Sequence, residues 1–195
     1  MLKGKKILKN LVKEIKLNNE LFNQLSSNDK RVQIAKDCLI RLTSNQFNMK
    51  GGNFFKTDAF QLNYDTGLDD GAWKFDVQKE INKPEMECTV CAKGGLFLSY
   101  VGRVNNVCVI PNINNIGDSN HEKLLELFSS RQLAMIEFAF EGSQCLHKDE
   151  NGFEIEFTDD ELEKLLNFYL KDTSDTDTMI AICNNIIENG GEFVL

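Results

Sequence analysis

The sequence predicts a single compact multi-helix domain, mainly α, with at most a minor two-stranded β element. Two observations predict the helical class: apolar residues recur mostly at three- and four-residue steps, and only 2 prolines interrupt the 195 residues. With 42% apolar and 27% charged residues, the composition excludes a disordered or low-complexity chain. The length, without a recognisable linker or repeat, indicates one domain spanning 1–195.

The N-terminal quarter of the chain is predicted to form two helices. Apolar residues at helical steps over 7–25 indicate the first, and six lysines up to Lys16 cover its other faces. Such a basic amphipathic helix packs its apolar stripe on the core, or lies on a membrane or an acidic partner, and packing is favoured. The second helix is expected from about 30 to 43, after capping residues at 27–29.

Residues 53–87 are predicted to be an irregular, aromatic-rich insertion. Their apolar residues show no periodicity, and glycine and aspartate punctuate them. A lid on the core is the favoured interpretation. The alternative is a binding segment, in which Phe54, Tyr64 and Trp73 contact a partner or stack on a ligand.

The centre of the chain is predicted to be a buried helix over 88–101, because this run is apolar nearly all round. Gly94 and Gly95 inside it are tolerated where a neighbouring helix approaches closely. The short β-branched run at 107–110 is a candidate strand, with an extended connector into Pro111 as the alternative. The alternating run at 153–157 is a second candidate strand, and a minor hairpin or sheet would pair the two.

Capping signals predict four helices in the rest of the chain. Three capping boxes open helices that end near Leu127, Gly142 and Leu170; they pair Ser119 with Glu122, Ser129 with Gln132, and Thr158 with Glu161. The last helix is expected over about 176–188, with the glycines at 190–191 as its stop.

The net charge of −8 is unevenly distributed: the first 50 residues carry +7 and residues 117–195 carry −13. An acidic chain disfavours nucleic acid as a partner, because a phosphate backbone requires a basic surface. The acidic half either faces a basic partner, imitates nucleic acid, or is a well-solvated surface, and the last is favoured.

The sequence indicates a cytoplasmic protein with reduced thiols and no membrane partner. No run approaches the roughly 20 apolar residues of a membrane span, and the lysine-rich start does not resemble a secretory signal. The six cysteines are too scattered for a disulfide-stapled secreted domain.

Cys88 and Cys91 form the one chemically suggestive spacing. Two thiols at i and i+3 hold a metal such as zinc, form a redox pair, or are simply buried, and burial is favoured. A structural zinc needs two further ligands, and no second pair stands at a standard spacing. The histidines suggest no catalytic triad, so we expect a protein that is not an enzyme.

Three stretches together resemble a family of small uncharacterised proteins encoded by tailed phages and prophages. They are 31–38 (RVQIAKDC), 88–97 (CTVCAKGGLF) and 128–141, and the segment 179–193 adds to the likeness. The chain departs from the pattern at Asp177-Thr178, where a basic residue is usual. The resemblance implies a phage-related intracellular protein and transfers no reaction.

Three functions follow from these observations. The first is a non-enzymatic binding protein that acts on a host component in the host cytoplasm, for example as an inhibitor of a host defence system. The second is a small-ligand protein, such as a sponge for a signalling nucleotide, in which Arg31, Arg41, Lys93 and Arg103 offset phosphate charge. The third is a zinc protein built on the CxxC pair. Self-association into a homo-oligomer is compatible with each of them.

Overall fold

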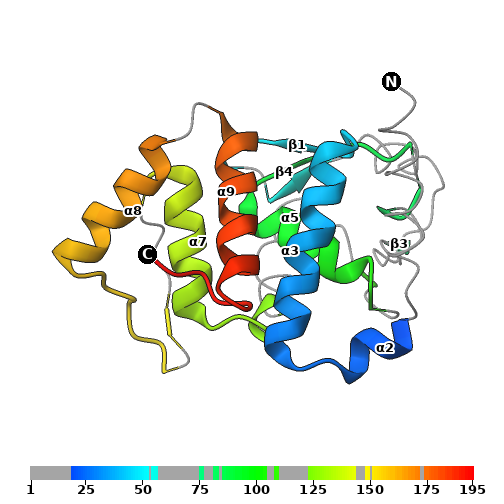
Figure 1. The fold of residues 1–195 in the computed structure, drawn as a ribbon, viewed down its shortest axis with the longest axis horizontal. Coiled ribbons are helices and arrows are strands. Elements are labelled where there is room, and N and C mark those ends of the chain that lie inside the picture. The colour runs from blue at the N-terminus through cyan, green and yellow to red at the C-terminus, as the bar shows by residue number, and fades with distance from the viewer. Residues whose placement is uncertain are drawn as a thin grey trace, which may run out of the picture.

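The computed structural model describes residues 19–52, 54–56, 75–76, 81–83, 85–104, 108–109, 123–143, 148–149, 151–171 and 174–195. Helices dominate this part of the chain, which confirms the mainly α fold class. They are α2 (Asn19–Gln24), α3 (Ser27–Thr43), α5 (Ala92–Val101), α7 (Ser130–Glu141), α8 (Asp159–Lys171) and α9 (Asp175–Glu188). Figure 1 shows α7, α9 and α3 side by side, with α8 at one end of the molecule and α2 toward the other.

Most predicted helix ends that fall on described residues agree closely with the structure, whereas the start near residue 7 and the capping box of Ser119 and Glu122 lie outside the described residues. The hydroxyls of Ser129 and Ser174 accept backbone N–H groups at the starts of α7 and α9. The capping box at the start of α8 is formed, because the Thr158 backbone N–H donates to Glu161 and the Glu161 N–H donates to the Thr158 hydroxyl. The start of α3 was misplaced: Ser26 caps this helix, which therefore begins three residues before the predicted residue 30.

The predicted helix over 88–101 is wrong in its first part. Cys88–Val90 forms strand β4, and α5 begins only at Ala92. In β4 the side chains of Cys88 and Val90 are buried on either side of a half-buried Thr89. A short apolar run does not distinguish a buried strand from a buried helix by periodicity, which explains the error.

Strand β4 is the centre of a small mixed sheet. It pairs in parallel with β1 (Phe47–Met49) and antiparallel with β2 (Phe55–Lys56). A second pair joins β3 (Phe75–Asp76) to β5 (Cys108–Val109). The described residues thus hold five short strands in two sheets, where at most one two-stranded element was predicted, and β5 pairs with β3 and not with 153–157.

The core lies where α3, α5 and α9 meet (Figure 1). Ile34 and Cys38 of α3 and Ile182 of α9 are fully buried there. Gly95 of α5 faces both helices: a Cβ on it would lie 3.3 Å from the Cys38 sulfur and 3.8 Å from the Met179 methyl group. The prediction that a glycine of this helix faces closely packed neighbours is therefore confirmed.

Gly94 has a different neighbour, the backbone of the chain itself. A Cβ at Gly94 would stand 1.5 Å from the Phe54 carbonyl oxygen, so no other residue fits. The Phe54 ring then packs on Phe97, with ring centroids 5.4 Å apart. The absence of a side chain at Gly94 thus allows the segment at Phe54 to cover the start of α5.

We predict that Gly94→Ala destabilises the fold by about 1–3 kcal/mol, because the added methyl group must displace the Phe54 backbone. Gly95→Ala is the matched control: it meets only side chains, at 3.3 Å or more, and gains helix propensity. Urea unfolding of both variants checks this. Equal losses of unfolding free energy in the two variants would contradict the role assigned to Gly94.

Candidate functional site

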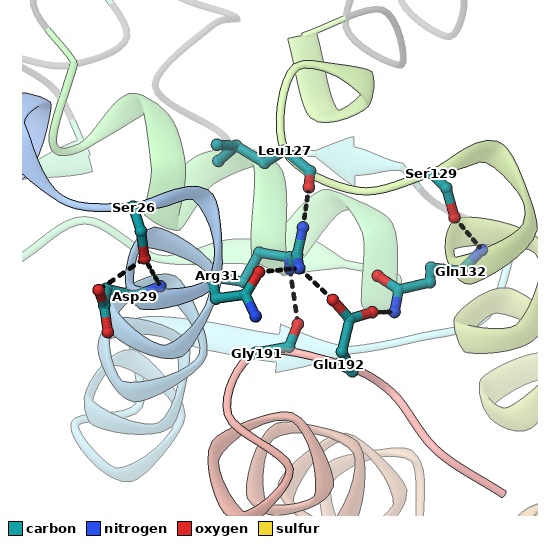
Figure 2. Close-up of polar contacts among 9 residues, drawn as sticks. Ser26, Asp29, Arg31, Leu127, Ser129, Gln132, Gly191 and Glu192 are labelled. Carbon is teal, nitrogen blue, oxygen red and sulfur yellow. Dashed lines mark hydrogen bonds and ion pairs between the residues drawn. The ribbon is translucent and has the colours of Figure 1, made fainter.

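Arg31, one of the predicted ligand-binding cations, is buried and bonded to the fold itself. Figure 2 shows its guanidinium between two backbone carbonyls and a carboxylate. It donates to the carbonyl oxygens of Leu127 at 2.5 Å and Gly191 at 2.7 Å, and pairs with Glu192. The Arg31 guanidinium is thus bonded to groups of the protein itself, and this counts against a role in binding phosphate.

Hydrogen bonds to side chains of α7 and α9 hold the segment that follows α9. The Gln132 amide on α7 donates to the second oxygen of Glu192 (Figure 2). The Asn185 side chain accepts from the Val194 N–H at 2.9 Å and donates to the Val194 carbonyl at 2.7 Å. These bonds fix the segment along α7 and α9.

Arg103 is also engaged. Its side chain forms two bonds of 2.5 and 2.6 Å with the Asp37 carboxylate, and both side chains are at most 4% exposed. Gln33 donates to the same carboxylate at 3.1 Å. The pair is thus a bidentate, buried ion pair between α3 and the end of α5.

A groove of about 470 Å³ lies beside this pair. It is lined by Leu21, Phe22, Gln24, Leu25, Gln33 and Arg103. Of the residues that were predicted to bind phosphate, Arg103 is among the described residues that line this groove. Asp37 offsets the charge of Arg103, and the rest of the described lining is uncharged, with apolar side chains from Leu21, Phe22 and Leu25.

Lys93 lies at the other end of α5 and is paired as well. Its ammonium group is 2.7 Å from Glu137, and the two side chains are 13% and 11% exposed. The 10 residues of α5 span about 15 Å, so one phosphate group does not reach both Lys93 and Arg103. Arg41 is buried too and donates to the Ile81 carbonyl, and burial lowers its pKa.

The three predicted aromatic contact residues do not form a described site. Phe54 is half-buried against Phe97 on the start of α5. Tyr64 and Trp73 lie outside the described residues. The structure therefore brings Phe54 and Lys93 to the same end of α5 and leaves Arg31 and Arg103 at other places in the fold.

Cys88 and Cys91 belong to different elements, since one lies in β4 and the other precedes α5. Their exposed fractions are 2% and 5%, and burial raises the pKa of Cys91 to about 11. Zinc and redox chemistry both require the thiolate, which this burial disfavours. Within the part that the structure describes, no three His, Cys, Asp or Glu side chains are placed to hold a metal ion.

The surface around the start of α8 carries exposed carboxylates. Two acidic groups have cationic partners: Asp160 pairs with Lys164, and Glu161 with Arg131 at 2.5 Å. The Arg131 side chain and the Thr158 N–H lower the pKa of Glu161 to about 2. Four exposed carboxylates form no ion pair with any described residue, and we call them the acidic segment: Glu154, Glu156, Asp159 and Glu163.

Sequence reasoning missed one exposed residue next to this segment. Phe153 is 71% exposed, more than any other large apolar side chain in the described ranges. Its alternation with Ile155 and Phe157 predicted a half-buried strand, and the structure buries Ile155 and half-buries Phe157 while leaving Phe153 in solvent. The signal that could have set Phe153 apart is the Asn151-Gly152 dipeptide directly before it, which is typical of a tight turn.

The comparisons with known proteins add no relative: no protein family, curated protein or solved structure matches the chain. Among the described helices, none is both long and apolar enough to cross a membrane. The chemistry of the chain's own residues is therefore the basis on which its function is inferred.

We predict that Asp37→Ala lowers the free energy of unfolding by about 3–5 kcal/mol, because it removes the carboxylate from a buried guanidinium. The double variant Asp37→Leu/Arg103→Met should be less destabilised than the sum of its two single changes. Chemical denaturation of the wild type, Asp37→Leu, Arg103→Met and the double variant measures this coupling. Additive losses would show that the pair is not a coupled unit.

We predict that the peptide carrying Cys88 and Cys91 reacts slowly with iodoacetamide in the folded protein at pH 8. A rise in pKa from 9 to about 11 reduces the thiolate of Cys91 from about one in ten to about one in a thousand. Mass spectrometry should show labelling at least about 100-fold slower than in urea-unfolded protein. Equal rates in the two states would refute the burial of these thiols.

Proposed function

We propose that this protein is a non-enzymatic binding protein that acts on a host component in the host cytoplasm. The observation that carries the proposal is the acidic segment, whose exposed carboxylates have no cationic partner in the described structure. Uncompensated surface charge of one sign steers and selects a partner of the opposite sign. The partner is a protein with a basic surface, and inhibition of a host defence system is the consequence we propose for this contact.

The engagement of the predicted ligand-binding residues supports this choice over a nucleotide sponge. Arg31, Lys93 and Arg103 each pair with a carboxylate of the protein itself. The groove beside Arg103 has an apolar lining from α2, and its one described cationic group is already paired with Asp37. Burial of the CxxC thiols likewise gives no support to a zinc centre.

A charge-neutralised variant tests the proposal. Glu154→Gln/Glu156→Gln/Glu163→Gln removes three charges from exposed side chains that have no described ion pair. We expect the wild-type protein to retain a basic host protein in pull-downs at about 0.1 M salt, and the variant to lose it. Higher salt should weaken the wild-type complex as well, because salt screens exposed charges.

The matched control is Glu85→Gln/Glu87→Gln/Glu188→Gln, which removes the same charge from other exposed positions. It should retain the partner as the wild-type protein does. If both triple variants retain the partner equally, or if the wild-type protein retains none, the proposal is wrong. Unchanged melting temperatures would show that the variants remain folded.

A further inference from the structure

The turn that displays Phe153 is closed by its own hydrogen bonds. Lys148 and Glu154 form an antiparallel bridge, and the Asp149 N–H donates to the Phe153 carbonyl at 2.8 Å. The Gly152 N–H donates to the Asp149 carbonyl at 3.0 Å. Gly152 has φ of +83°, a conformation that a residue with a Cβ rarely adopts. Several backbone hydrogen bonds among the described residues therefore hold Phe153 in place.

The Asp149 carboxylate accepts hydrogen bonds from two backbone N–H groups of the turn. One of its carboxylate oxygens accepts the backbone N–H groups of both Phe153 and Asn151, each at 2.9 Å. The bond from Phe153 is the main reason why the pKa of Asp149 is lowered. The Asp149 carboxylate thus fixes the backbone position from which the Phe153 side chain extends.

The chain that follows the turn is anchored to α7. The Arg131 guanidinium donates to the Glu156 carbonyl at 3.1 Å and stacks over the Phe157 ring at 5.3 Å. Phe157 also meets Phe138 edge to face, with centroids 6.1 Å apart, and Ile155 is 7% exposed. Phe153 is thus the first of three alternating apolar residues, and the one that the described structure leaves uncovered.

We propose that Phe153 is the anchor of the binding surface, and that its partner offers an apolar pocket rimmed by Lys or Arg. This inference rests on the proposed function and adds the residue and the pocket chemistry. A rigid aromatic side chain loses little conformational entropy on binding and provides large apolar area, as interface anchors do. The exposed carboxylates of Glu154 and Glu156 beside it complement a basic rim, and disfavour an anionic membrane or nucleic acid.

Site-specific photo-cross-linking tests the inference in host cells. The probe is p-benzoylphenylalanine in place of Phe153, with the same probe at Leu125 as control, since Leu125 is also exposed, at 40%. We expect a cross-link from position 153 and not from 125, to an apolar stretch of a host protein flanked by Lys or Arg. A cross-link to a second copy of this chain, or none at 153, overturns the inference.

Affinities for the identified, purified partner complete the test. Phe153→Ala should weaken binding at least about 30-fold without changing the melting temperature, because the side chain is exposed. Phe153→Trp should stay within about tenfold of wild type. Asp149→Ala keeps the ring and loosens the turn, and should weaken binding between about two- and tenfold.

The two proposals fail in different ways. If the triple variant of the acidic segment loses the partner while Phe153→Ala binds as wild type does, the anchor is wrong and the proposed function stands. If the wild-type protein binds no host protein, the proposed function itself fails. Equal affinities of the Phe153→Ala and Phe153→Trp variants for the partner would also overturn the assignment of the ring as anchor.

Discussion

One buried guanidinium connects α3 to the segments that precede α7 and follow α9, and the rest of the structure depends on this connection. Arg31 on α3 supplies donors to the Leu127 carbonyl ahead of α7 and to the Gly191 carbonyl after α9. Buried backbone carbonyls outside helices need such donors, because water does not reach them. Glu192 extends the network to Gln132 on α7, whose neighbour Arg131 fixes the chain that leads into α8. The exposed acidic surface is thus attached to the core through consecutive residues of α7.

The sequence predicts the helices well because their signals are local. Ser129, Thr158 and the glycines after α9 bond to residues within five positions of themselves, so spacing alone identifies them. The strands, in contrast, depend on pairing with residues that are distant in the sequence. Cys88–Val90 becomes a strand because it pairs with Phe47–Met49, far away in sequence, and no local pattern reports that pairing.

The site was harder to predict for the same reason. A cation in a sequence looks available for a ligand until its partner is known, and the carboxylates that pair with Arg31, Lys93 and Arg103 lie 161, 44 and 66 residues away. Likewise, Phe153 belongs to a regular alternation, and the pattern does not report which of its residues contact α7, as Phe157 does through Phe138 and Arg131. What the sequence does show is the excess of negative charge in its C-terminal half.

The bond from Arg31 to Gly191 joins residues 160 positions apart, and this separation has a consequence for synthesis. The ribosome makes Arg31 160 residues before the Gly191 carbonyl that accepts its hydrogen bond. Until α9 and Glu192 have been made, α3 lacks both the helix that covers its apolar side and the carboxylate that balances its guanidinium. The core around α3 is therefore completed only after α9 has been synthesised, and until then the nascent chain exposes the apolar side of α3.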